Sequence, residues 1–297
     1  MTDLSIIIVS YNTREFLKKC LDAIYASDMQ TFLYEVIVVD NASSDNSLGM
    51  VREHFKDVIV IENKENVGFS TANNKGIQKS RGRYILFLNS DAIVEKNTLS
   101  AMVKFMEEIK DAGAATCKVE LVSGGLDDAA HRGFPTPWNA FAHFTGLSKI
   151  FTKTKLFSGY NLTWMDLDKT HQIDALAGAF MMVRREAGEQ VGWWDEDYFF
   201  YGEDIDFCYR LKAENWKIYY VPGVRVFHYK GVSGGIKKHS QHISTADKDT
   251  KRRVTIARFD AMRIFYRKHY ENKYPRVITW LVLRAIDLRR WLTLKSL

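Results

Sequence analysis

Cysteine is scarce in this sequence of 297 residues: only Cys20, Cys117 and Cys208 occur, far apart and with no spacing typical of a metal site. An odd number of distant cysteines argues against a disulfide framework and favours buried thiols in a reducing compartment. No basic segment and apolar run precede the first strand, so no secretory signal is apparent. We therefore expect a cytoplasmic protein.

Two common phosphate-binding sequences are also missing. The first predicted strand is followed by Ser-Tyr-Asn-Thr and not by G-x-G-x-x-G, and no G-x-x-x-x-G-K-[ST] occurs. Both motifs would place phosphate on a helix N-terminus. If phosphate binds to this chain, a metal at Asp91 is the expected means of neutralising its charge.

Charge is distributed unevenly along the chain. The sequence is 46% hydrophobic, which is enough for a sizeable core, and its formal net charge is +6. From Lys251 to the C-terminus there are 13 basic and three acidic residues, a net charge of +10, whereas the preceding residues carry −4. The basic character therefore belongs to the C-terminal tail.

The most informative stretch is Tyr84 to Asp91, five apolar or aromatic residues that end in Asn-Ser-Asp. A continuous apolar run of this length predicts a buried central strand. Asn89 and Asp91 are two positions apart and should point to the same side. Such oxygen donors at the carboxyl end of a strand suit a hard cation with phosphate oxygens, although a turn cap is the simpler alternative.

Strands and helices alternate through the first 110 residues. Apolar runs at 4–9, 34–39 and 58–61 precede the central strand, and helical spacing separates them. Asn12 with Glu15 resembles a capping box for the first helix. The pattern predicts an α/β fold, a Rossmann-like and mostly parallel sheet flanked by helices. The polar residues that end these strands should then meet at one edge: Ser10, Asn12, Asp40, Asn41, Asn89 and Asp91.

A second informative block runs from Ile173 to Gly234. It contains the small-residue patch around Gly178 and then six acids and four aromatic residues between 195 and 206. Apolar residues at helical spacing after Asp204 place Glu203 and Asp204 at a helix N-terminus, where the dipole stabilises an ionised carboxylate. A carboxylate of this kind suits a general base.

The residues at 5–13, 36–47, 65–76 and 86–91, in this order and spacing, resemble the nucleotide-sugar half of inverting GT-A glycosyltransferases of family 2, closest to the bacterial rhamnosyltransferase-like branch. The resemblance covers about residues 4–233. It implies a GT-A catalytic domain at 1–235, with a nucleotide-sugar half at 1–117 and an acceptor half at 118–235. A basic amphipathic helical tail follows at 236–297.

By that resemblance, Asp204 would be the catalytic base with Glu203 beside it. Asp91 and His228 would bind Mg²⁺ or Mn²⁺, although Asn89 stands where the family's motif begins with an acid. The nucleotide would contact Ser10, Tyr11, Asn12, Asp40, Asn41, Asn66, Gly68, Asn73, Asn89, Ser90 and Asp91. The donor or acceptor sugar would contact Gly178, Trp193, Trp194 and Asp195.

The remaining segments are read from composition. Residues 118–173 are interpreted as an insertion on the acceptor side, with a helix or lid at 138–150, and we expect His131 and Arg132 to face solvent. In the tail, Pro275 should separate two helices, and no run is long enough to span a bilayer. Arg-rich helices with Trp and Leu favour attachment to the inner face of the cell membrane; packing on the catalytic domain and a homodimer interface are the alternatives.

The predicted activity is transfer of a sugar, rhamnose from dTDP-rhamnose as the first candidate, to a hydroxyl of a glycan or lipid-linked glycan in cell-surface polysaccharide synthesis. A donor with N-acetylglucosamine, galactose or galactofuranose on UDP is an alternative, as is a catalytically silent nucleotide-sugar-binding subunit. We do not expect nucleic-acid binding, because the tail's aromatic and Arg residues lie on helical apolar faces and not on a stacking platform.

Overall fold

The computed structural model describes residues 2–295 except 233, 236–243 and 245. Within these residues a nine-stranded sheet forms the centre, in the order β3-β2-β1-β4-β8-β6-β9-β5, with β7 paired to β9. The strands are β1 (Leu4–Ser10), β2 (Tyr34–Asp40), β3 (Ile59–Glu62), β4 (Tyr84–Leu88), β5 (Ala92–Val94), β6 (Ala112–Leu121), β7 (His171–Gln172), β8 (Phe180–Arg184) and β9 (Lys217–His228).

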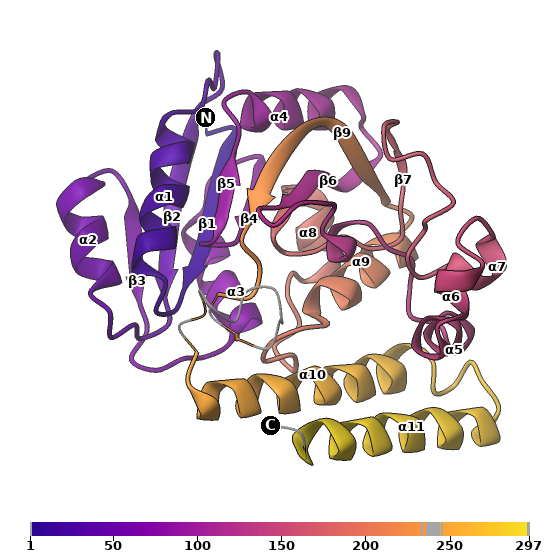
Figure 1. The fold of residues 1–297 in the computed structure, drawn as a ribbon. Helices are drawn as coiled ribbons and strands as arrows, with labels where there is room; N and C mark the ends of the chain where they lie inside the picture. Colours follow the sequence, from indigo (N-terminus) through magenta and orange to yellow (C-terminus); the bar gives the residue numbers. More distant parts are fainter. Residues whose placement is uncertain (1, 233, 236–243, 245, 296–297) are drawn as a thin grey trace.

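Helices cover both faces of the sheet (Figure 1). They are α1 (Arg14–Tyr25), α2 (Ser47–His54), α3 (Phe69–Lys79), α4 (Thr98–Glu108), α5 (Pro137–Thr145), α6 (Leu147–Ile150), α7 (Lys155–Ser158), α8 (Arg185–Val191), α9 (Glu203–Ala213), α10 (Lys248–His269) and α11 (Arg276–Lys295), with a short 3₁₀ helix, η1 (Asp128–Ala130). Ile6 and Ile8 pack in the cluster that contains α1 and α4, whereas Ile7 packs in the cluster that contains α3 and α9. This alternation is the period-two pattern of a strand buried on both faces. The predicted α/β fold is confirmed.

Strand pairing brings the predicted polar ends together. β1 pairs in parallel with β2 and β4, and Ser10 lies opposite Asp40. β5 pairs antiparallel with β9, so that Ala92 lies opposite His228. His228 thus reaches Asp91 although 137 residues separate them.

The capping box expected from Asn12 and Glu15 is wrong. Thr13 precedes the first turn of α1 and makes no side-chain cap, and Asn12 has a left-handed φ of 53°. The Asn12 Oδ1 atom instead accepts from the Ser44 N–H at 2.8 Å, and the backbone N–H of Asn12 donates to Ser43 Oγ at 2.9 Å. Asn12 therefore joins the loop after β1 to the loop after β2.

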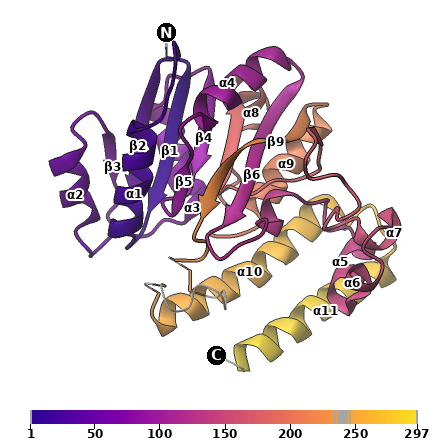
Figure 2. The same ribbon diagram turned by 45° about the horizontal axis from the view of Figure 1, so that its top comes forward.

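The tail forms two long helices that lie side by side across the edge of the sheet where β1 and β4 end (Figures 1 and 2). Pro275 separates α10 from α11, as predicted. Phe265 and Tyr266 of α10, together with Tyr270 directly after it, are buried against Tyr198. Residues 236–243, where the predicted tail begins, lie outside the described residues.

Polar contacts also hold α10 to α9 and to the loop before α9. His269 Nε2 lies 2.7 Å from Asp206 Oδ1, and the Asp206 carboxylate is buried and also accepts from Arg210 Nε at 2.7 Å. Lys268 Nζ lies 2.5 Å from Asp195 Oδ2. Since the buried Asp206 carboxylate needs such partners, α10 is packed as part of the same core as α9.

The segment 118–173 contains the end of β6, η1, the three helices α5 to α7, and β7. Helices α5 and α6 occupy the stretch expected to be a helix or lid. They lie beside α11 in both views (Figures 1 and 2). The Arg289 guanidinium of α11 lies 3.9 Å from the centre of the Phe144 ring of α5.

Candidate active site

One cavity of about 1090 Å³ lies between the strand ends, the N-terminus of α9 and the helices α5, α10 and α11. Of the predicted nucleotide residues, those in its wall are Tyr11, Asn41, Asn66, Gly68, Asn89, Ser90 and Asp91. Its wall also contains Gly178, Glu203, Asp204 and His228. The cavity therefore joins the first informative stretch of the sequence to the second.

Four predicted nucleotide residues lie behind this wall: Ser10, Asn12, Asp40 and Asn73. Ser10 Oγ is 3.1 Å from Thr13 Oγ1, which donates to Ser90 Oγ at 3.0 Å, so Ser10 supports the wall indirectly. Asn73 Nδ2 donates to the Phe69 carbonyl of its own helix at 2.9 Å. These residues shape the loops that line the cavity.

Asp40 is buried beside Asn41. Its Oδ2 accepts from the Ser43 N–H at 2.8 Å, while its Oδ1 has no hydrogen-bond partner among the described residues. Burial raises the pKa of this carboxyl above its ordinary value, although the hydrogen bonds from Ser43 oppose the shift. Asp40 therefore supports the loop at Ser43 from behind the cavity wall.

Gly68 occupies a tight place in the wall. Its φ is +88°, and a Cβ there would lie 2.6 Å from the Phe199 carbonyl oxygen. The Asn41 side chain donates to the Gly68 carbonyl at 3.1 Å, and the Phe69 N–H donates to the Phe199 carbonyl at 2.9 Å. Glycine is therefore required both by the left-handed conformation and by the close approach of the 198–202 loop.

His228 connects two carboxylates at the base of the cavity. Its Nε2 lies 3.1 Å from Asp91 Oδ1 and 3.2 Å from Asn89 Nδ2, and its Nδ1 lies 2.9 Å from Asp127 Oδ2. Burial opposes a charge on this imidazole, but Asp91 and Asp127 outweigh it and raise the pKa of His228 to about 9. Asp127 also pairs with Lys230, and although burial alone would raise its pKa, His228 and Lys230 hold it far below the ordinary range.

These side chains fit part of a divalent-metal site. Asp127 on Nδ1 orients His228 so that Nε2 faces Asp91, the arrangement in which a carboxylate positions a metal-binding imidazole. In the described part of the chain, no group of three or more His, Cys, Asp or Glu side chains is spaced to hold a metal by itself. Asp91 and His228 would therefore share Mg²⁺ or Mn²⁺ with the phosphate oxygens of a donor.

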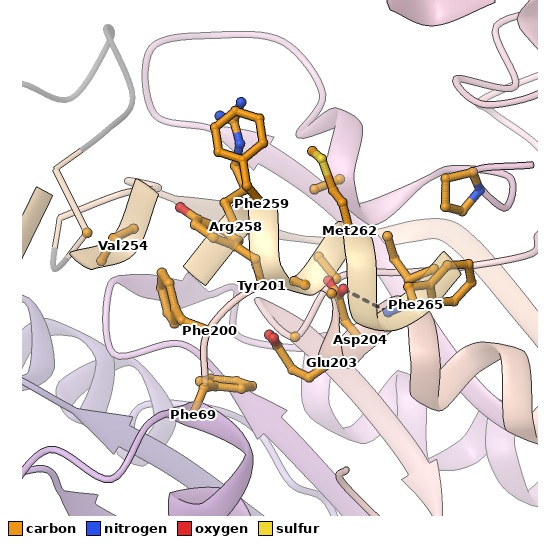
Figure 3. A pocket seen from close by; sticks show the side chains of 18 of the residues that line it. Phe69, Phe200, Tyr201, Glu203, Asp204, Val254, Arg258, Phe259, Met262 and Phe265 are labelled. Atoms are coloured by element: carbon orange, nitrogen blue, oxygen red, sulfur yellow. Dashed lines mark hydrogen bonds between the residues drawn. The ribbon is translucent and has the colours of Figure 1, made fainter. Parts of the chain in front are cut away.

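At the other end of the cavity, Asp204 lies in the first turn of α9. Its Oδ1 accepts from the Ile205 N–H at 2.8 Å, and its Oδ2 pairs with the Arg132 guanidinium (Figure 3). The expectation that Arg132 faces solvent is wrong, because its side chain is only 11% exposed and it neutralises Asp204. His131 is likewise buried, with Nε2 2.7 Å from His171 Nε2.

Glu203 lies beside Asp204 and also lines the cavity (Figure 3). It is 6% exposed, and its Oε2 has no hydrogen-bond partner among the described residues. Burial, followed by the charge of Asp204, raises the pKa of Glu203 to about 8. The two neighbouring carboxyls therefore differ in character: Asp204 has a cationic partner, and Glu203 is held protonated at neutral pH.

The three remaining predicted sugar contacts lie away from the cavity. Trp194 is 2% exposed and stacks on Phe207, with ring centres 5.1 Å apart, and Trp193 packs in the same cluster. Asp195 pairs with Lys268 of α10. Aromatic residues that do line the cavity near α9 are Phe69, Phe199, Phe200 and Tyr201.

Sequence reasoning missed Asp127 and Lys230 and misread Arg132. Asp127 lies in a loop shortly after a glycine pair and has no charged partner nearby in sequence, since His228 is 101 residues away. The sequence did show many charged residues near the predicted strand ends, but such a density does not show which of them pair with one another.

A model of the family described as Glycosyl transferase family 2 matches residues 5–187. The rhamnosyltransferase WbbL of Escherichia coli K12 is 32% identical over 232 residues, which cover 75% of this chain and 82% of that protein. The N-acetylglucosaminyl-diphospho-decaprenol L-rhamnosyltransferase of Mycobacterium tuberculosis is 23% identical over 308 aligned positions, which cover 100% and 94%.

Solved structures share the fold at lower identity. The structure of S. aureus TarS 1–349 superposes with a TM-score of 0.55 at 16% identity, over 91% of this chain and 74% of that chain. GalNAc-T7, crystallised with UDP, GalNAc and Mn²⁺, superposes with a TM-score of 0.59 at 20% identity, over 77% of this chain and 44% of that one. Both likenesses support the GT-A type of α/β fold.

The raised pKa of Glu203 gives a pH dependence that can be measured. Between about pH 4.5 and pH 8 the native state retains a proton that the unfolded state releases, so this residue makes the protein less stable as pH rises. We expect Glu203→Gln to remove this decrease in the free energy of unfolding, which is at most about 1.4 kcal/mol per pH unit. Urea unfolding of both proteins at pH 5, 6.5 and 8 measures it.

The control is Glu186→Gln, at an exposed position of α8. Its free energy of unfolding should follow the wild-type pH profile. Parallel profiles for the wild type and Glu203→Gln would contradict the protonated state of Glu203.

Proposed function

Because this chain belongs to glycosyl transferase family 2, it is a glycosyltransferase, and we propose that it moves a sugar with inversion from a nucleoside diphosphate donor to a hydroxyl of a glycan or lipid-linked glycan. The observation that carries this proposal is the single cavity that joins the strand ends at Asn89 to Asp91 with the carboxylate of Asp204. The rhamnosyltransferases among the relatives make dTDP-rhamnose the first candidate donor and cell-surface polysaccharide the first candidate product.

The donor would lie along the strand ends. Tyr11, Asn41 and Asn66 line the part of the cavity suited to the nucleoside, and the close backbone approach at Gly68 narrows it. Asp91 Oδ1 and His228 Nε2 would hold a divalent cation against the diphosphate. When bound, such a cation stabilises the charge that grows on the leaving group.

The acceptor hydroxyl would approach Asp204. The acceptor oxygen attacks the anomeric carbon, Asp204 takes its proton, and the bond from that carbon to the diphosphate oxygen breaks with its electron pair going to the diphosphate. Arg132 and the Ile205 N–H each use one lone pair of the Asp204 carboxylate, so further lone pairs remain for the proton. Arg132 and the N-terminus of α9 place positive charge beside this carboxylate.

Replacing the base tests this mechanism. We expect Asp204→Asn to lower turnover by ~10²–10⁴-fold, because the amide cannot accept the acceptor's proton, while donor binding stays within about twofold. Initial rates and donor titrations measure both effects. Asp166→Asn, at an exposed loop position, should keep wild-type rates, and near-normal turnover in Asp204→Asn would remove this residue from the mechanism.

A donor panel tests the metal and the sugar. We expect the protein with Mg²⁺ or Mn²⁺ to bind or slowly hydrolyse one sugar nucleotide from a set of dTDP-rhamnose, UDP-GlcNAc, UDP-galactose and UDP-galactofuranose. Chelation of the metal and the substitution Asp91→Ala should each weaken donor binding by about tenfold or more, since the diphosphate loses its counter-charge. Calorimetric titration measures donor binding, and release of the nucleotide measures hydrolysis. Binding without hydrolysis or transfer would instead support a catalytically silent subunit, and absence of binding to every donor would contradict the proposed donor class.

We also propose that the tail attaches the protein to a membrane surface. On α11, the exposed apolar residues are Val277, Trp280, Leu281, Leu288, Trp291 and Leu292. Helix α5 contacts α11 through Phe144 and Arg289. The segment from α5 to α7 also has exposed apolar residues, namely Trp138, Phe141, Phe144, Ile150, Phe151 and Leu156. Within the described residues, no helix is both long and apolar enough to cross a bilayer. Apolar residues beside Arg and Lys on one surface suit an anionic lipid interface.

Vesicle sedimentation measures this attachment. We expect the wild type to partition onto vesicles of anionic phospholipid and the double variant Trp280→Gln, Trp291→Gln to lose about tenfold or more of that binding, because Trp anchors a surface helix at the interface. Leu33→Gln, exposed in the loop before β2, is the control and should bind as the wild type does. Equal partitioning of the double variant would contradict the attachment.

A further inference from the structure

The 198–202 loop carries a tyrosine in an uncommon backbone conformation. Tyr201 has a left-handed φ of 71°, and Gly202, which follows it at the N-terminus of α9, has a φ of 84°. Glycine adopts this conformation readily, whereas a bulky side chain seldom does. Asparagine or a second glycine would form the same turn with less strain. The turn into α9 therefore does not explain why position 201 holds a tyrosine.

The Tyr201 side chain forms part of the cavity wall (Figure 3). Its ring packs on Phe200, with ring centres 4.4 Å apart, and its hydroxyl oxygen would lie 3.7 Å from a Cβ added at Gly234. Among the described residues, no group forms a hydrogen bond with this hydroxyl. A hydroxyl in a cavity wall without such a partner can both donate to a ligand and accept from it.

Charged groups from both ends of the cavity act on this phenol. Burial raises the pKa of Tyr201 above its ordinary value, although the nearby Arg258 opposes the shift. The carboxyls of Glu203, Asp91 and Asp204 add to the increase. The phenol is therefore neutral at physiological pH and keeps its proton for a hydrogen bond. Its place is also informative, because it lies within electrostatic reach of Asp91 at one end of the cavity and of Asp204 at the other.

This place coincides with the one that the transferred sugar would occupy. In the proposed reaction the diphosphate is held at Asp91, and the acceptor hydroxyl approaches Asp204. An inverting attack comes from the side of the anomeric carbon opposite the leaving group, so the sugar ring must lie between these two carboxylates. A cavity side chain within reach of both carboxylates therefore lies beside the sugar ring.

The aromatic neighbours of Tyr201 in the wall are apolar. Phe69, Phe199 and Phe200 line the cavity near α9, and the Phe69 ring would lie 3.1 Å from a Cβ added at Gly178. Aromatic faces pack on the C–H groups of a sugar but do not distinguish one arrangement of hydroxyls from another. Of these four aromatic residues, Tyr201 has the hydroxyl, so it is the member of this wall that can recognise the orientation of a sugar hydroxyl.

We propose that Tyr201 selects the sugar donor: its hydroxyl forms a hydrogen bond with a hydroxyl of the transferred sugar, and its ring packs against that sugar beside Phe200. This inference rests on the proposed sugar transfer and names a residue that recognises the sugar in that site. A donor whose sugar lacks the matching hydroxyl leaves the Tyr201 hydroxyl without a partner, which is an effective means of rejection. Tyr201 thereby takes the role expected of Trp193 and Trp194, whose rings pack in the core.

The variant Tyr201→Phe tests the hydrogen bond, because it keeps the ring and removes only the hydroxyl. The probes are the sugar nucleotide selected by the donor panel, with dTDP-rhamnose first, and the matching nucleoside diphosphate without its sugar. Calorimetric titration of the full-length protein with Mg²⁺ should show about tenfold weaker binding of the sugar nucleotide, since a hydroxyl of the sugar loses its partner. Binding of the nucleoside diphosphate should stay within about twofold of the wild type, because it makes no contact with Tyr201.

Tyr201→Asn separates recognition of the sugar from the shape of the turn. Asparagine accepts a left-handed conformation, so the loop should keep its course while the phenol is lost. We expect the sugar nucleotide to bind about tenfold or more weakly, again with little change for the nucleoside diphosphate. Tyr25→Phe is the matched control, because Tyr25 is exposed on α1 and stacks on Phe55 outside the cavity wall, and it should bind both probes as the wild type does.

Analogues of the sugar nucleotide that each lack one hydroxyl of the sugar complete the test. For one of them, Tyr201→Phe and the wild type should bind within about twofold of each other, because the contact is already missing. An equal loss for every analogue, or unchanged binding of the sugar nucleotide in Tyr201→Phe, would overturn the proposal. Equal weakening of both probes would place Tyr201 at the nucleotide and would overturn it as well.

Failure of this inference is distinct from failure of the proposed function. If the wild type binds no sugar nucleotide, the donor class itself is wrong and the inference falls with it. If the wild type binds one and Tyr201→Phe binds it equally well, the proposed sugar transfer stands and only the role of Tyr201 is lost.

Discussion

The hydrogen bonds of His228 are the interaction on which this site depends. They join Asp91, at the end of the parallel half of the sheet, to Asp127 after β6, and they do so from the last residue of β9. Each of the three side chains is buried, and none would be stable there without the others, because an isolated buried charge costs several kcal/mol. The site therefore forms only when both halves of the chain have packed into one sheet.

A second pairing of charges gives the active site its asymmetry. Glu203 and Asp204 are neighbours at the start of α9, yet Arg132 pairs with Asp204 alone. The absence of a partner for the Glu203 Oε2 among the described residues, together with burial, keeps a proton on that carboxyl. The same helix terminus thus presents to one cavity a carboxylate paired with Arg132 and a carboxyl whose pKa is raised.

The tail helices form part of the wall of the proposed active site. Helix α10 covers the cavity and is attached through Asp206, which lies two residues after the proposed base and contacts His269. This attachment explains why Trp193, Trp194 and Asp195 do not line the cavity: the tryptophans fill the core beneath α9, and Asp195 is engaged by Lys268. The surface expected to meet sugar is used for internal packing, because large aromatic side chains contribute most when fully buried.

The sequence by itself determined the α/β fold, the strand ends at Asn89 to Asp91 and the position of Asp204 at a helix N-terminus. These features follow from local patterns, namely apolar runs, period-two burial and helical spacing, and such patterns are visible without knowing any distant contact. Arg132 was misread, and Asp127 and the tail's place over the cavity were not foreseen, for the opposite reason. Their roles depend on partners such as Asp204 and His228, which are 72 and 101 residues away in sequence and meet them only through tertiary packing. Only the folded structure decides which charged side chains are neutralised and which remain open to a ligand.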